Sequence, residues 1–96
     1  MQSAAFTVSR HSKYSVVAGA IAARAREDIG PLLTAIGDEA VCNAIMAVCT
    51  ARLYLEEDNL DIRFIAKRET IEKTGGDGVP RNLKTMVIRL YVESVE

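Results

Sequence analysis

Two cysteines, Cys42 and Cys49, are the first candidates for chemistry in this chain of 96 residues. They lie seven positions apart in GDEAVCNAIMAVCTARLYL, a segment whose apolar pattern predicts a helix. Over seven residues a helix rises by about 10.5 Å, whereas a disulfide needs Cα atoms within roughly 7 Å and one metal ion needs its thiolate ligands close together. We therefore interpret both cysteines as small apolar residues on one helix face, while chemistry between the cysteines of two chains stays open.

The other reactive residue types do not form a catalytic pattern. His11 is the single histidine, too few for a histidine metal cluster, and no strained-turn serine motif accompanies it. We interpret it either as a solvated loop residue or as a phosphate contact. GGDG (75–78) lacks the spacing and the following helix of a phosphate-binding loop, and EEDNLD (56–61) lacks the spacing of a calcium loop. The sequence predicts a protein that is not an enzyme and that needs no metal or cofactor.

Composition indicates a small globular protein with an aliphatic core. Hydrophobic residues make up 49% of the chain, and there is no Trp. No apolar run reaches the roughly 20 residues that cross a bilayer, and the N-terminal MQSAAFTVSR lacks the pattern of a secretory signal. We expect one domain over residues 1–96, located inside the cell, in the cytoplasm or nucleus, without membrane contact.

Hydrophobic periodicity and turn residues predict the element order β-α-β-α-β-β. Strands are expected at residues 4–9, 32–36, 60–73 and 83–95, and helices at residues 16–28 and 39–55. Ser15 and Asp38 are the expected N-caps of the helices. Gly19 is expected to allow another backbone to approach the first helix closely. The apolar strand at 32–36 is typical of a strand covered on both faces.

The three strands that helices separate are expected to be parallel neighbours joined by right-handed crossovers. The last two strands are expected to form a hairpin with an extended loop at about 69–83. One apolar stripe of the second helix is expected to pack on the sheet and comprises Val41, Ala44, Ile45 and Val48. A second stripe needs cover from the first helix or from a second copy of the chain, and comprises Cys42, Met46, Cys49 and Leu53.

Charge is distributed unevenly along the chain. Residues 1–26 contain four Lys or Arg and no acidic residue, residues 27–61 contain eight acidic residues and one Arg, and residues 63–84 contain six basic and three acidic residues. The predicted topology places the basic segments at one end of the sheet and most acidic residues at the other. This pattern indicates either a surface for phosphate contacts or a solvated hairpin whose charges keep the protein soluble. The basic end would present Arg10, His11, Lys13, Lys67, Arg68, Lys73, Arg81 and Lys84.

Two segments together resemble the stage V sporulation protein S family, a bacterial branch of the Alba-like superfamily. They are VSRHSKYSVVAGAIA and AIGDEAVCNAIMAVCTAR. The first matches the family's V-S-x-x-S start and V-A-G-A helix, and the second matches its A-I-G turn and closing A-R. The resemblance implies an α+β, Alba-like two-layer sandwich, in which a four-stranded mixed sheet carries two helices on one face.

The resemblance also implies a homodimer or higher oligomer that binds DNA or RNA, in a regulatory or architectural role. Alba-like proteins use the loop after strand one, the loop before helix two and the hairpin arms. Carried over to this chain, the nucleic-acid-binding residues are Arg10, His11, Ser12, Lys13, Lys67, Arg68, Lys73, Arg81 and Lys84. The candidate dimer face comprises Cys42, Met46, Cys49 and Leu53.

Several positions depart from the family pattern. Cys42 and Met46 stand where the family has an amide and a lysine, and Asp38 and Glu39 follow the A-I-G turn in place of small neutral residues. These changes favour an alternative function, a protein–protein interaction or assembly module of the same fold that has lost nucleic-acid binding.

Overall fold

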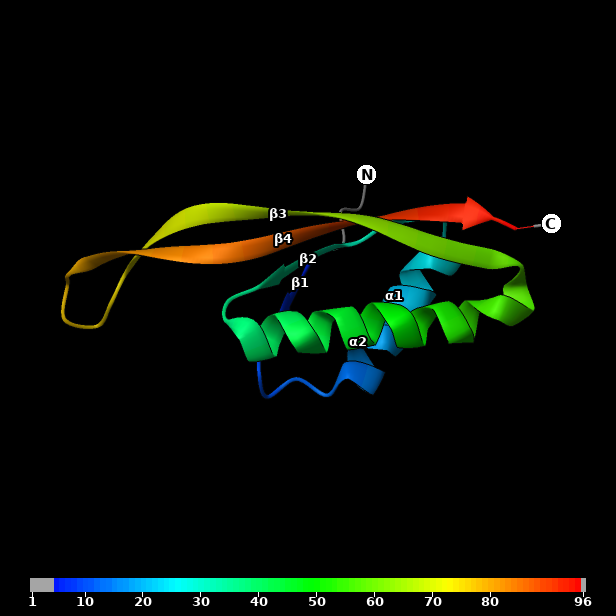
Figure 1. Cartoon of the computed structure of the whole chain (residues 1–96), viewed down its shortest axis with the longest axis horizontal. Coiled ribbons are helices and arrows are strands. Elements are labelled where there is room, and N and C mark those ends of the chain that lie inside the picture. The colour runs from blue at the N-terminus through cyan, green and yellow to red at the C-terminus, as the bar shows by residue number, and fades with distance from the viewer. Residues whose placement is uncertain (1–4, 96) are drawn as a thin grey trace.

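The computed structural model describes residues 5–95 and contains two helices and four strands in the predicted order (Figure 1). In chain order the elements are β1 (Ala5–Val8), α1 (Tyr14–Arg26), β2 (Leu32–Ala35), α2 (Asp38–Leu55), the short 3-10 helix η1 (Glu56–Asp58), β3 (Leu60–Thr74) and β4 (Pro80–Ser94). None of the described helices is long and apolar enough to cross a membrane.

The four strands form one mixed sheet in the order β1-β2-β4-β3. β1 and β2 are parallel, and β4 is antiparallel to both of its neighbours, β2 and β3. The expectation that the first three strands are neighbours is therefore wrong, because β4 lies between β2 and β3. A central position gives β4 hydrogen-bonding partners on both edges and buries Ile88 and Leu90, which are 0% and 2% exposed.

Both helices cover the same face of the sheet (Figure 1). The buried residues of the two helices are mostly alanines, which leave room for α1 and α2 to pack closely. Beneath them, Leu33 of β2 and Ile88 of β4 are completely buried. The predicted sheet-facing stripe of α2 packs in or against this core. β2 is covered on one face only, contrary to expectation, since Leu32 and Thr34 are only half-buried on the other face.

β3 and β4 extend well beyond the rest of the sheet. They pair continuously from Leu60 opposite Ser94 to Thr74 opposite Pro80, whereas β2 reaches only as far as Met86 of β4. Residues 69–84 therefore form a two-stranded arm, and the molecule is 52 Å long. Most of the segment expected as an extended loop at 69–83 is strand, and only residues 75–79 turn the chain.

The helix starts and one glycine also differ from expectation. α1 has Lys13 at its N-cap, so Ser15 lies inside the first turn, and α2 has Gly37 at its N-cap, with φ 93°. Asp38 instead begins α2, where a negative charge favours the positive end of the helix dipole. Gly19 is not a point of close approach, because a Cβ added there has nothing within 4 Å.

Candidate nucleic-acid interface

The loop between β1 and α1, residues 9–13, lies at the end of the sheet from which the arm projects (Figure 1). β1 and β2 run parallel and end together at Val8 and Ala35, and Ala35 is opposite Met86, next to the arm. The strand-one loop, the start of α2 and the hairpin are thus brought to one end, as the topology argument predicted.

Hydrogen bonds within the loop give it a defined shape. The backbone N–H of Ser9 donates to Ser12 Oγ at 2.9 Å, and the N–H of His11 donates to Ser9 Oγ at 3.1 Å. The N–H of Ser12 donates to the Ser9 carbonyl oxygen at 3.1 Å. Arg10 Nε donates to His11 Nε2 at 3.1 Å, and the side chains of Arg10, His11 and Lys13 are exposed. Ser12, a predicted contact residue, therefore helps to shape the loop that presents these side chains.

The side-chain amide of Asn43 joins α2 to this loop. Its Nδ2 lies 3.0 Å from the carbonyl oxygen of Ser9, 3.2 Å from that of Arg10 and 3.1 Å from that of Ser12. Three carbonyl groups of the loop therefore point at one amide on the helix, which leaves the charged side chains on the outer side.

The basic residues of the arm, together with Lys67 and Arg68 just before it on β3, divide between the two faces of the sheet. Arg68 and Lys84 lie on the helix-covered side and line a hollow of about 540 Å³ between the arm and the start of α2. Lys73 lies on the helix-free side and lines a groove of about 480 Å³. Lys67 lies on the same side as Lys73 by strand alternation. Arg81 also lies there, because it is the cross-strand partner of Lys73. We call Arg68 and Lys84 the helix-side pair, and Lys67, Lys73 and Arg81 the helix-free set.

Acidic side chains lie among these cations but pair with few of them. Arg81 Nη2 lies 3.0 Å from Asp77 Oδ2 in the turn. Asp38 lines the same hollow as the helix-side pair. Within residues 5–95, no ion pair is formed by six of the predicted basic residues, which are Arg10, Lys13, Lys67, Arg68, Lys73 and Lys84.

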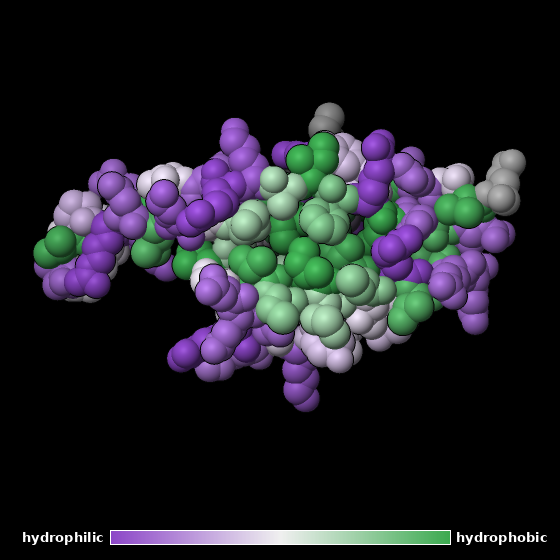
Figure 2. Space-filling view, viewed as in Figure 1, coloured by the Kyte–Doolittle hydropathy of each residue, from purple (hydrophilic) through white to green (hydrophobic). Residues whose placement is uncertain are grey.

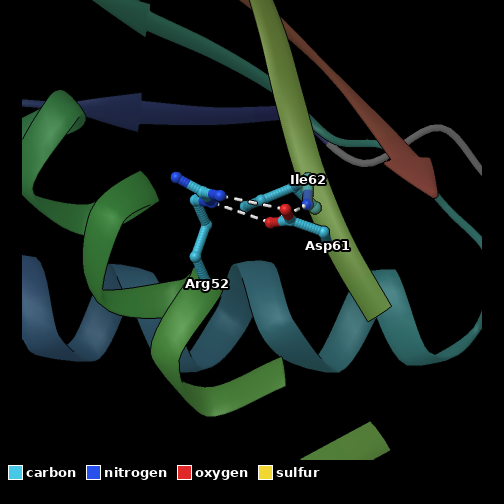
Figure 3. A network of polar contacts seen from close by, with 3 residues as sticks. All are labelled: Arg52, Asp61 and Ile62. Carbon is cyan, nitrogen blue, oxygen red and sulfur yellow. Dashed lines mark hydrogen bonds and ion pairs between the residues drawn. The ribbon is translucent and has the colours of Figure 1, made fainter. Parts of the chain in front are cut away.

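Arginines at the opposite end of the molecule are paired with carboxylates. Figure 3 shows Arg52 of α2 donating to both oxygens of Asp61 on β3, at 2.7 and 2.9 Å. These hydrogen bonds hold the pKa of Asp61 below its usual value, although burial acts in the opposite direction. The N–H of Ile62 also donates to this carboxylate, at 2.8 Å. The other pairs there are Arg24 with Glu27, Arg26 with Asp58 and Arg63 with Glu93. Cations at this end are thus engaged within the fold, unlike most of those near the arm, where Arg81 alone forms an ion pair among residues 5–95.

The candidate dimer face is exposed. Met46 and Leu53 are 42% and 63% exposed, and Cys42 and Cys49 are free thiols at the surface. Figure 2 shows apolar side chains gathered over α2 and β3, and Phe64 of β3, 41% exposed, adds to them. β3 is an edge strand of the sheet. This stripe of α2 faces away from the alanine-lined contact with α1, so α1 does not provide the cover that it needs.

Two residues at the arm end were missed by sequence reasoning. Asn43 is the one uncharged polar side chain in the first three turns of α2, and that isolation within an apolar helix is a signal that could have identified it. Arg89 lines the helix-free groove together with Lys73. Its position in the apolar run VIRLYV indicated a strand but not which face it occupies.

The arrangement of one mixed sheet, two helices and a long hairpin arm defines an Alba-like fold. The chain is similar in structure to Alba from Thermoplasma volcanium, with a TM-score of 0.67 over 91% of this chain and 98% of that one, at 15% sequence identity. The expected α+β Alba-like fold, with two helices on one face of a four-stranded mixed sheet, is therefore confirmed.

The sequence assigns the chain to a family that is more specific than the fold. The family model for stage V sporulation protein S matches residues 4–93, so the chain belongs to that family, and the resemblance drawn from the sequence is confirmed. No curated protein sequence matches the chain significantly.

Proposed function

We propose that this protein is a non-enzymatic homodimer that binds DNA or RNA through its arm end, in a regulatory or architectural role. The observation that carries the proposal is the gathering of exposed cations without ion pairs on the β1–α1 loop and the arm, while the arginines of the opposite end are paired. The family resemblance supports it, since Alba-like proteins bind nucleic acids with the same loop and arm.

Physical chemistry favours phosphate as the ligand of this surface. Phosphate contacts release condensed counterions and give affinity without base recognition. Flexible Lys and Arg side chains on a projecting arm can follow a sugar–phosphate backbone, and the loop is already ordered by its own hydrogen bonds. We found no exposed aromatic cluster among the loop and arm residues of the described chain, so the proposal is backbone contact rather than base stacking.

The test is a titration of fluorescent mixed-sequence DNA and RNA at several salt concentrations. The proposal expects binding at about 50 mM salt that weakens linearly in a log–log plot, with a slope of about 0.9 per phosphate contact on duplex DNA. No binding to either nucleic acid at that salt concentration contradicts the proposal.

Variants separate the two faces of the arm. Replacing the helix-side pair (R68Q/K84Q) removes two charges on one face, and K73Q/R81Q removes two charges on the other. The control R24Q/R26Q makes the same change in net charge at the opposite end of α1. We expect one or both arm variants to lower the salt slope by roughly 0.9 per lost contact, and the control to leave it unchanged. Equal effects of all three variants would indicate that binding depends on net charge alone and not on where the cations lie.

The apolar face supports a second candidate function, a protein assembly module without nucleic-acid binding. Met46 and Leu53 are solvent-exposed apolar residues of α2, and Met46 replaces the lysine of the family pattern. A stable oligomer together with absence of binding in the titration above is the result that favours this function over the first.

A further inference from the structure

We infer that Asn43 is a positioning residue, which fixes the basic β1–α1 loop on α2 and so sets where Arg10, His11 and Lys13 are presented. The expected effect on binding rests on the proposed function, whereas the role of Asn43 in holding the loop rests only on its own hydrogen bonds. Asn43 itself is neutral, half-buried and directed at the backbone of the loop.

The chemistry of the three contacts requires an amide donor. The groups facing Asn43 are the carbonyl oxygens of Ser9, Arg10 and Ser12, between 3.0 and 3.2 Å from Nδ2, and carbonyl oxygens only accept hydrogen bonds. An isosteric carboxylate at this position would present oxygen to all three and repel them. An alanine would leave the carbonyls to water, since two of the three contacts are solvent-exposed.

The Lys13 carbonyl oxygen accepts hydrogen bonds from the N–H groups of Val16 and Val17 at the start of α1. Among residues 5–95, the other remaining hydrogen bonds of the loop connect the loop to itself. They join the two serines to each other and to the N–H of His11. They preserve the local turn but do not fix its direction relative to the sheet, the arm or α2. In the part of the chain that the structure describes, the side-chain hydrogen bonds between this loop and α2 come from Asn43, over 31 to 34 positions of sequence.

This attachment joins the cationic loop to the helix that carries the candidate dimer face. Asn43 is adjacent in sequence to Cys42, which belongs to that face. A rigid loop presents its cations in one geometry, so less conformational freedom is lost when nucleic acid binds. Loss of the amide should therefore weaken binding without removing a phosphate contact.

The experiment compares wild type with N43D, N43A and N43Q, and uses N82A as a control. Asn82 is an exposed amide on the arm, and no side-chain hydrogen bond is recorded for it among residues 5–95. Amide hydrogen exchange of Ser9, His11 and Ser12 reports on the loop, and that of Ile88 reports on the core. Thermal unfolding confirms that each variant is folded.

We expect N43D and N43A to speed exchange of the loop amides by about tenfold, the loss of roughly one hydrogen bond, with the core amide unchanged. N43Q keeps the donor on a longer side chain and should lie between them and wild type. Nucleic-acid affinity should fall about three- to tenfold in N43D and N43A, with the salt slope of N43A unchanged because no cation is lost. N82A should behave as wild type.

Unchanged loop exchange in both N43D and N43A would overturn the inference. If exchange rises but affinity is unaffected, Asn43 shapes the loop and the loop does not bind, which also overturns the positioning role. Absence of nucleic-acid binding by wild type contradicts the proposed function instead, and the exchange data still decide whether Asn43 holds the loop.

Discussion

At the scale of residues, two glycines have opposite surroundings. A Cβ added at Gly30 would collide with the carbonyl oxygen of Leu90, whereas one added at Gly19 meets nothing within 4 Å. The N–H of Leu90 also donates to the carbonyl oxygen of Pro31 at 3.1 Å. The backbone at Gly30 therefore cannot move away without disturbing the contact between the start of β2 and the central strand β4.

Alanine substitutions of these glycines should change stability in opposite directions. G19A should raise the free energy of unfolding by up to about 1 kcal/mol, because Ala is the better helix former on an exposed surface. G30A should lower it by roughly 1–3 kcal/mol, the usual cost of forcing atoms into filled space. Urea denaturation measures the free energy of unfolding of both variants. An unchanged value for G30A would contradict the close approach to Leu90.

The carboxylate of Asp61 should make stability depend on pH. Its hydrogen bonds from Arg52 lower its pKa in the folded state, so the folded protein binds the proton more weakly than the unfolded chain does. The stabilisation is fully present above the unfolded pKa, about 3.9, and is lost as the pH falls from there through the folded value.

Thermal unfolding of wild type and D61N between about pH 7 and pH 2.5 tests this pH dependence. At neutral pH D61N should melt a few degrees lower, a small effect because both partners are partly solvent-exposed. The difference should shrink as the pH falls below the unfolded pKa. A difference that stays constant over this range would show that the charge of Asp61 does not matter.

At the scale of elements, local patterns predicted the helices and strands well and their arrangement less well. The periodicity of α2 identified both its packed stripe and its exposed stripe. The place of β4 between β2 and β3 depends on pairing between distant segments, and no local pattern encodes it. The same holds for the attachment of the loop to Asn43, which joins segments more than 30 positions apart.

The arm shows why the candidate site was only partly predictable. Its strands alternate charged and polar residues with few apolar ones, a pattern typical of a loop, and they are ordered as strands because each pairs with the other. Because side chains alternate between the two faces along a strand, neighbouring cations lie on opposite faces of the sheet. The sequence predicted that all of these cations lie at one end of the sheet. It did not predict which of them belong to the helix-side pair and which to the helix-free set.

Removing the arm should separate folding from binding. The buried core has no member between Ile62 and Thr85, so replacing residues 70–84 with Asn-Gly, a favoured two-residue hairpin turn, should leave thermal unfolding nearly unchanged. The shortened protein lacks three of the basic residues, Lys73, Arg81 and Lys84. Its salt slope on duplex DNA should therefore fall, by about 0.9 for each of these that contacts phosphate.

An unchanged slope in the folded, shortened protein would show that the arm does not contact nucleic acid. A variant with the full arm and the turn residues 75–79 replaced by a different flexible turn of equal length is the matched control. It keeps the arm strands with their basic residues, and so should retain the wild-type slope.

At the scale of the whole molecule, charge and apolar surface are separated. Most cations of the loop and arm are unpaired, whereas four ion-paired arginines lie at the opposite end. The exposed apolar stripe of α2 lies between them (Figure 2). Association through that stripe would leave the helix-free set of each copy, on the other face of the sheet, exposed. A two-fold dimer would then offer two sets of cations to one nucleic acid.

The variant L53E tests this arrangement, with I65E as its control. Leu53 and Ile65 are both 63% exposed, but Leu53 belongs to the candidate dimer face and Ile65 to the helix-free side of β3. Both variants add the same charge at the same degree of exposure. Light scattering coupled to size exclusion should give about twice the 10.5 kDa chain mass for wild type and I65E, and the single-chain mass for L53E. Equal masses for both variants would contradict the assigned face.

The same pair of variants predicts how binding depends on assembly. If both copies of a dimer contact one nucleic acid, a monomer loses the contacts of the second copy while keeping every cation of its own. The salt slope of L53E should then be about half that of I65E, and its affinity should fall by more than the loss of any single cation, because the second copy no longer binds at high effective concentration. A monomeric L53E with the full slope would mean that one copy makes all the contacts, and that self-association has a role other than nucleic-acid binding.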